Sequence, residues 1–126
     1  MLRPPADARR YPRLSVPAMY SLLRMGPTGQ RAYPWTGHIY DISMSGMRFE
    51  LDQPVDAGTS VRVRGMLPGD SHTTFRAAGC IIRLHDDEEE AFGPTRMAMT
   101  FESFQNQTDV HRLTQYLAHH QVNRAA

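Results

Sequence analysis

Short segments in which apolar and polar residues alternate constrain the fold of this chain most. Met47, Phe49 and Leu51, for example, alternate with the charged residues Arg48 and Glu50. An alternation of period two places the apolar side chains on one face of a β-strand, whereas a helical face repeats every three to four residues. The pattern therefore predicts a mainly β protein.

Six such segments follow one another, and glycine, proline and other turn-forming residues separate them. The first alternates through Val16, Ala18, Tyr20 and Leu22. The other five are expected at residues 36–42, 47–51, 60–67, 74–84 and 96–101. An open sheet would leave its edge strands exposed, so six short strands with hairpin-length connections favour a closed antiparallel β-barrel.

The end of the chain changes to a helical period. Val110, Leu113 and Leu117 recur at helical spacing after Thr108, which is a suitable N-cap, and Asp109 suits the positive end of a helix. The sequence therefore predicts one amphipathic C-terminal helix. We expect it to pack on the barrel or to cover one of its mouths.

The N-terminal residues lack an apolar period and are rich in proline and arginine, which predicts a flexible arm. The expected division is thus an arm at residues 1–13, a barrel at 14–104, and a helix and tail at 105–126. All fourteen basic residues of the chain are arginines, and Arg9, Arg10 and Arg13 are clustered in the arm. Planar guanidinium groups suit phosphates and the edges of purines.

Length and charge exclude several classes of protein. A chain of 126 residues forms one small domain, and it has no apolar run of the roughly 18 residues that a membrane span needs. The first residues also lack the apolar stretch of a signal peptide, so we expect a cytoplasmic protein without membrane insertion. The net charge of +1 argues against a protein that coats nucleic acid polymers. A barrel that binds single strands would interleave aromatic and basic residues, whereas Arg62 and Arg64 alternate with valines.

The sequence gives little support for catalysis or for a metal site. It has no Ser/His/Asp set, CxxC pair or glycine-rich phosphate loop, so we expect no enzyme and no cofactor. The single Cys80 lies in an apolar run and is expected to be a buried thiol. The acidic run HDDEEE at residues 85–90 is interpreted as a solvated turn rather than a calcium site. His111, His119 and His120 are interpreted as a solvated helix face rather than metal ligands.

A polar turn at residues 41–46 is the remaining candidate site. Asp41, Ser43 and Gly46 lie between two strand-like segments, where such residues serve either the geometry of the turn or a ligand pocket. Combined with the arginines of the arm, they match the chemistry of guanine. An arginine fork grips O6 and N7, and a carboxylate accepts the N1–H and N2–H donors. Further arginines can neutralise phosphates, and the glycine allows close approach to the backbone.

The same residues carry a resemblance to a known family. RRYPR contains R-x-x-x-R and DISMSG contains D-x-S-x-x-G, and in this order they resemble the two signature motifs of the PilZ domain, together with the following Arg48-Phe49 pair. The resemblance implies a six-stranded barrel with a C-terminal helix that binds the bacterial second messenger cyclic di-GMP. It implies that the ligand-binding residues are Arg9, Arg13, Asp41, Ser43 and Gly46, and Arg10 joins them because it lies inside the first motif. The residue after Gly46 is Met47, where many members have a second glycine.

The resemblance also predicts how the protein acts. A cyclic di-GMP receptor of this kind would draw its arm onto the barrel when it binds the ligand, and an unidentified downstream protein would recognise the new surface. The alternative is a PilZ-like adaptor that binds no nucleotide and acts through protein contacts alone. The two intact motifs favour the receptor.

Overall fold

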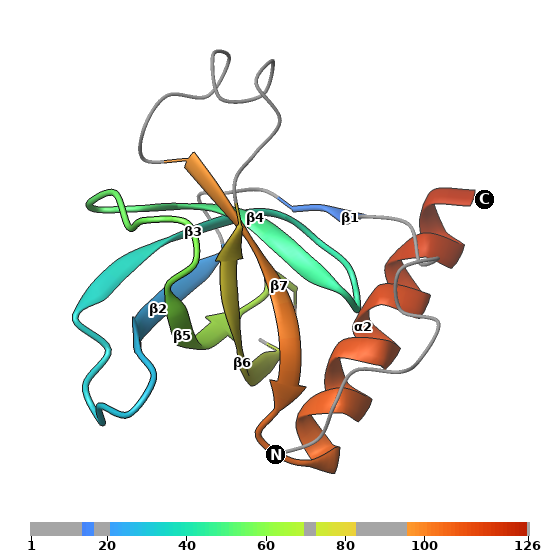
Figure 1. The fold of residues 1–126 in the computed structure, drawn as a ribbon. Coiled ribbons are helices and arrows are strands. Elements are labelled where there is room, and N and C mark those ends of the chain that lie inside the picture. Colours follow the sequence, from blue (N-terminus) through green and yellow to red (C-terminus); the bar gives the residue numbers. More distant parts are fainter. Residues whose placement is uncertain (1–13, 17–20, 70–72, 83–95, 126) are drawn as a thin grey trace.

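The computed structural model describes residues 14–16, 21–69, 73–82 and 96–125 (Figure 1). The predicted arm lies outside the described residues. The strands are β1 (Leu14–Ser15), β2 (Leu22–Pro27), β3 (Trp35–Ile42), β4 (Gly46–Leu51), β5 (Ser60–Met66), β6 (Thr74–Ile82) and β7 (Arg96–Phe104). The helix α2 (Gln107–Ala125) follows them.

Six of the strands form a closed antiparallel barrel. Their order around the barrel is β3-β2-β5-β6-β7-β4, and the pairing of β4 with β3 closes the ring. The short β1 adds a further pairing to β3. The predicted mainly β fold, a six-stranded antiparallel barrel followed by a C-terminal helix, is therefore confirmed.

The barrel interior is built from the apolar positions of the alternating segments. In β4, Met47, Phe49 and Leu51 point inward and are at most 3% exposed. In β7, Met97 and Phe101 are buried in the same core, as the alternation predicts. Phe49 lies opposite Met97 in the pairing of β4 with β7, so residues from neighbouring strands meet inside the barrel. Apolar burial of this kind is the main term that stabilises the fold.

The first predicted strand differs from the observed one. The buried positions are the even-numbered Leu14 and Val16 and then the odd-numbered Ser21, Leu23 and Met25, so Leu22 faces outward and is 48% exposed. At the change, the Ser21 hydroxyl replaces part of the backbone ladder, because it accepts from the Ile39 N–H at 3.0 Å and donates to the Ile39 carbonyl at 2.8 Å. The predicted continuous alternation through Leu22 is therefore wrong. Residues 17–20 lie outside the described residues.

The N-cap of α2 is Asn106 rather than the predicted Thr108. The Asn106 Oδ1 accepts a hydrogen bond from the backbone N–H of Asp109 at 3.0 Å, which satisfies one of the free donors of the first helical turn. Thr108 lies within that turn. The Asp109 side chain turns toward the barrel instead of toward solvent, and only 1% of the residue is exposed.

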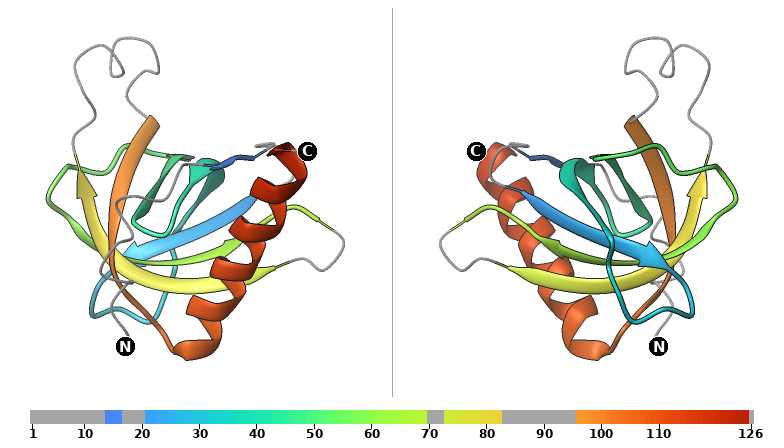
Figure 2. Two further views of the ribbon diagram at one scale, coloured as in Figure 1. Left: turned by 90° about the vertical axis from the view of Figure 1, so that its right-hand side faces the viewer. Right: turned by 90° about the vertical axis from the view of Figure 1, so that its left-hand side faces the viewer.

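The helix packs alongside the barrel, mainly on β6 and also on β1 and β7 (Figure 2). Leu113 and Leu117 are buried in the shared core as predicted, and Tyr116 joins them. The Tyr116 hydroxyl donates to the Pro68 carbonyl at 2.8 Å and so ties the helix to the connection between β5 and β6. In the described part of the chain, no helix has the length and apolar character needed to cross a membrane.

Candidate functional site

The turn between β3 and β4 uses Ser43 for its own geometry. The backbone N–H of Ser43 donates to the Gly46 carbonyl at 2.9 Å. The Ser43 hydroxyl lies 3.0 Å from the hydroxyl of Ser45 and accepts from the Ser45 N–H at 3.3 Å. Ser43 is only 1% exposed. These contacts account for a serine at this position as a turn residue.

Gly46 is required by the close approach of β7. Gly46 lies opposite Thr100, and a Cβ added to it would be 2.2 Å from the carbonyl oxygen of Met99. The φ angle of Gly46 is not positive, so the turn does not need glycine for a left-handed conformation. The space beside Gly46 where a side chain would project is therefore occupied by the backbone of β7.

A β-bulge in β3 sets the direction of Asp41. Ile39 pairs with Phe49 and Asp41 pairs with Arg48, so β3 has one residue more than β4 between these two pairs. An extra residue of this kind changes which face of the sheet the following side chains occupy. Ile39 is fully buried, and Asp41 shares the outer face with its partner Arg48. The bulge thus brings the carboxylate to the outside of the barrel.

Asp41 is the centre of a row that crosses four strands. Ser15 of β1 lies opposite Asp41 on one side, and Arg48 of β4 lies opposite it on the other. Arg48 in turn lies opposite Ala98 of β7. Asp41 and Arg48 are both half-buried. The described chain therefore starts directly beside Asp41, and Arg13 precedes Ser15 by two residues.

A second group of side chains on β3, β4 and β7 lies next to this row. The guanidinium of Arg96 lies 3.6 Å from the ring centroid of Tyr40, which is the geometry of a cation–π contact. The Arg96 Nε is also 3.7 Å from the Glu50 Oε2. Tyr40 and Arg96 are not among the site residues that the sequence predicts. No local pattern could have found them, because strand register alone brings these distant residues together.

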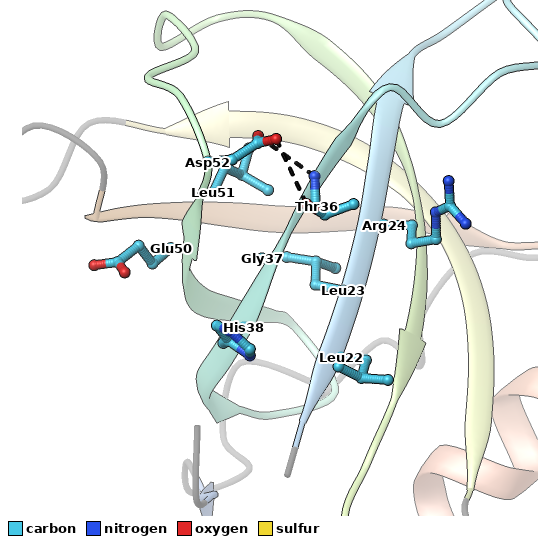
Figure 3. Close-up of a pocket in the computed structure, with 9 residues that line it drawn as sticks. All are labelled: Leu22, Leu23, Arg24, Thr36, Gly37, His38, Glu50, Leu51 and Asp52. Atoms are coloured by element: carbon cyan, nitrogen blue, oxygen red, sulfur yellow. Dashed lines mark hydrogen bonds between the residues drawn. The ribbon is translucent and has the colours of Figure 1, made fainter. Parts of the chain in front are cut away.

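An open pocket of about 520 Å³ lies farther along β3 and β4, on the outer face that these strands share with β2 (Figure 3). Its lining residues are Leu22, Leu23, Arg24, Thr36, Gly37, His38, Glu50, Leu51 and Asp52. Hydrogen bonds between neighbouring segments hold the wall of the pocket. Nδ1 of His38 lies 2.9 Å from the Ser21 carbonyl, and the Asp52 carboxylate accepts from the N–H of Thr36 at 3.4 Å. Of the predicted site residues that the structure describes, Asp41, Ser43 and Gly46, none lines this pocket.

The structure describes only three of the six predicted site residues. Asp41 lies on the outer face, whereas Ser43 and Gly46 are buried within the turn. Arg9, Arg10 and Arg13 lie outside the described residues. The structure therefore describes the barrel half of the predicted site and leaves the arm half as a prediction.

The histidines, the acidic run and Cys80 are the other candidate groups. Among the described residues, no three His, Cys, Asp or Glu side chains form a group that could hold a metal ion. His120 is half-buried and stacks on Tyr116 at 4.0 Å, and the acidic run at residues 85–90 lies outside the described residues. Cys80 is only half-buried, so the prediction of a buried thiol is wrong. The physical reason is the strand alternation, which directs Ile81 into the core and Cys80 to the outer face.

Comparisons with known proteins agree with this architecture. The PilZ domain family matches residues 7–119. A solved structure of the Bacillus subtilis inhibitor of motility, MotI/DgrA, aligns with a TM-score of 0.63 and 21% sequence identity. The alignment covers 94% of this chain and 53% of the other, so this chain spans about half the length of that protein, and the likeness shows the fold. A search of curated proteins gives no match.

The family match includes both signature motifs, the barrel and most of α2. PilZ domains are binding domains without catalytic activity, and they are commonly receptors for cyclic di-GMP. The match covers far more than half of the chain, and the observed barrel and helix have the architecture that the resemblance implies. The chain therefore belongs to the PilZ domain family, whose domains are non-catalytic binding domains.

Proposed function

We propose that this PilZ domain is a receptor for cyclic di-GMP, and that the ligand binds on the outer face of β1, β3 and β4. Binding draws the N-terminal arm onto the barrel, and a downstream protein recognises the resulting surface. In this proposal the arm contributes Arg9, Arg10 and Arg13, and the barrel contributes Asp41 and the turn that follows it.

One observation carries the proposal: the pairing of Ser15 with Asp41. Arg13 precedes Ser15 by two residues, and two residues of extended chain span at most about 7 Å, so the length of the chain allows Arg13 to reach the Asp41 carboxylate. The two motifs are separated by the whole of β2 in the sequence, yet the pairing of β1 with β3 holds their adjoining segments together. This arrangement supports a single site that reads one base from two sides.

The chemistry of the two halves is complementary to guanine. The Asp41 carboxylate accepts the N1–H and N2–H donors, and the arginines grip O6 and N7 and neutralise the phosphates. Arg48, which lies opposite Asp41, adds positive charge to the same face. Ser43 and Gly46 belong to the site through the turn that they shape. Met47 points into the core, so it does not obstruct the outer face.

Calorimetric titration tests the proposed ligand. The wild-type protein is expected to bind cyclic di-GMP and to bind cyclic di-AMP much more weakly, because adenine lacks the O6 acceptor and the N1–H donor. A hydrogen bond to a charged group contributes roughly 1.5–3 kcal/mol, so Asp41→Ala should weaken binding by about 10-fold to 100-fold.

The matched control for Asp41 is Asp56→Ala. Asp56 is exposed, and among the described residues its side chain makes no hydrogen bond or ion pair, whereas its backbone carbonyl accepts from Thr59. The Asp56→Ala variant should bind cyclic di-GMP like the wild type. Equal affinity of the wild type for both nucleotides would refute the assignment of the ligand, and an equal loss in both variants would refute the role of Asp41.

Hydrogen exchange tests the proposed movement of the arm. Fixing each backbone residue costs roughly 1–2 kcal/mol, so the arm should order only where its arginines contact the ligand. We expect protection of residues 8–14 to rise when cyclic di-GMP is added, while residues 97–101 in the core of β7 stay unchanged. An arm that is protected without ligand, or unprotected at saturation, would contradict the mechanism even if the ligand binds.

A second candidate function is supported by the turn itself. Ser43 and Gly46 have structural roles in this turn, so these two motif residues would be needed even in a domain that binds no nucleotide. If neither nucleotide binds in the titration, a PilZ-like adaptor that acts through protein contacts is the function that remains.

A further inference from the structure

Three arginines form a continuous row across the outer face of β2, β5 and β6. Arg24 of β2 lies directly opposite Arg64 of β5, and Arg64 lies directly opposite Arg76 of β6. All three residues are exposed. Opposed residues on neighbouring strands have Cβ atoms roughly 4.5–5.5 Å apart, so the row concentrates three positive charges on a small area.

Little negative charge on the described surface compensates this row. The strands β2, β5 and β6 contain no acidic residue. Arg76 forms one ion pair, with Asp109 of α2 at 3.5 Å, whereas Arg24 and Arg64 have neither an ion pair nor a hydrogen bond within the described part of the chain. Figure 3 shows the Arg24 guanidinium pointing away from Asp52, one of the two acidic residues that line the pocket.

The row is unfavourable for the fold on its own. Like charges that lie directly opposite each other destabilise a pair of strands, and polar uncharged residues at these positions would avoid the repulsion. Arg64 takes the largest share of this cost, because it has an arginine on each side. The arrangement is therefore better explained by an external anionic group than by the stability of the barrel.

The surface around the row combines charged, aromatic and apolar side chains. Arg62 is two residues from Arg64 on the same face of β5, and its guanidinium lies 4.8 Å from the ring centroid of Tyr33. Leu22 lies opposite Met66 at the next outward position, and Leu22 is the large apolar residue that is 48% exposed. A partner that fits this surface has several acidic groups with an apolar side chain next to them.

The row is separate from the site proposed for cyclic di-GMP. In the closed order of the barrel, β5 lies across from β4, with two strands between them in each direction. Arg24 lies on β2, which neighbours β3, but it pairs with Thr36, five residues along β3 from Asp41. A ligand bound at Asp41 and Arg48 therefore leaves the row exposed. One domain can thus use the two surfaces at the same time.

We infer that the surface formed by Arg24, Arg64 and Arg76 with Leu22 is a docking site for an acidic segment of a partner protein. Aspartate and glutamate carboxylates match the arginine forks bidentately, and Leu22 accepts an apolar side chain of the same segment. A nucleic acid strand would need aromatic platforms, and the ring of Tyr33 is already covered by Arg62. The inference rests on the proposed function for its role in signalling, but the docking itself needs no nucleotide.

Fluorescence anisotropy with a labelled peptide of glutamate and leucine residues tests the docking site without nucleotide. An exposed ion pair contributes up to about 1 kcal/mol, so Arg64→Gln should weaken peptide binding about fivefold, and Arg24→Gln with Arg64→Gln about 20-fold. Arg31→Gln is the matched control, because Arg31 is exposed in the connection between β2 and β3 and the charge change is the same. Circular dichroism checks that each variant is folded.

The outcomes separate the inference from its alternatives. An equal loss in Arg31→Gln, or no loss in the double variant, would overturn the docking site. A single-stranded RNA or a phosphatidylserine vesicle that binds more tightly than the peptide, through the same arginines, would overturn the choice of a protein partner. The double variant should still bind cyclic di-GMP like the wild type. Failure of the wild type to bind cyclic di-GMP, with peptide binding intact, would refute only the proposed function.

Discussion

Replacement of Asp109 is expected to loosen α2 from the barrel. The Asp109 Oδ1 accepts the backbone N–H of Arg76 at 3.2 Å, and the Oδ2 lies 3.5 Å from the Arg76 Nη2. The Oδ2 is buried and, within the described residues, has no hydrogen bond of its own. The carboxylate also lies in the first turn of α2, where the helix dipole favours negative charge. One side chain thus joins the start of the helix to β6.

The size of the effect follows from these contacts. A hydrogen bond to a charged group contributes roughly 1.5–3 kcal/mol, and the helix dipole adds roughly 0.3–1 kcal/mol. The ion pair adds little, because nearly half of the Arg76 side chain (46%) is exposed and solvent screens it. Asp109→Ala should therefore lower the free energy of unfolding by about 3 kcal/mol. Asp109→Asn keeps an acceptor for the Arg76 N–H and loses only the charge, so it should cost about 1 kcal/mol.

Urea unfolding followed by circular dichroism measures these differences. Glu102→Gln is the control, because Glu102 is exposed on β7 and its substitution should change stability by less than about 0.5 kcal/mol. The reasoning is refuted if Asp109→Asn is as destabilising as Asp109→Ala, or if both variants match the control. A further readout is the acidic peptide: Asp109→Asn removes the carboxylate that pairs with Arg76 and should tighten peptide binding.

Three further predictions concern the site and the core. Arg13→Lys should weaken cyclic di-GMP binding nearly as much as Arg13→Ala, because lysine keeps the charge but lacks the planar fork; calorimetry in which lysine restores full affinity would refute a bidentate contact. Gly46→Ala should destabilise the barrel by about 1–3 kcal/mol in urea unfolding, because the new Cβ overlaps the Met99 carbonyl; unchanged stability would contradict the role of β7 at this glycine. Burial raises the pKa of Tyr116 above its ordinary value of 10.0. Its protonated phenol therefore stabilises the fold fully below about pH 10, and this contribution is lost as the pH rises through the raised pKa. The drop in unfolding free energy between pH 8 and pH 11 should be smaller in Tyr116→Phe than in the wild type. An equal drop in both proteins would contradict a pH-dependent contribution of the Tyr116 phenol to stability.

The sequence by itself determined the fold class and the family. The alternation of Met47, Phe49 and Leu51 reported a strand with one buried face, and the helical spacing of Leu113 and Leu117 reported an amphipathic helix. These signals are local, because the period of a strand or a helix depends only on which face of one segment is buried. The two motifs are equally local, so they identified the PilZ family without any structure.

Predictions from local sequence patterns were wrong or incomplete where contacts between segments decide the structure. Thr108 has the residue type of an N-cap, but Asn106 takes that role, because α2 begins at Gln107 and the Asn106 side chain accepts from the Asp109 N–H. Leu22 follows the alternation of Val16, yet the inward positions change to odd numbers before it. The local sequence does not explain why position 46 needs glycine, whereas the Met99 carbonyl of β7 beside it supplies a structural reason.

Only the tertiary structure decided which residues share a surface. The bulge in β3 brings Asp41 to the outer face, and strand pairing sets Ser15 and Arg48 on its two sides. The alignment of Arg24 with Arg64 depends in the same way on the register of β2 with β5. A shift of one residue in either pairing would turn these side chains to the opposite face. Register is a property of two paired strands, so the periodicity of one segment cannot predict it.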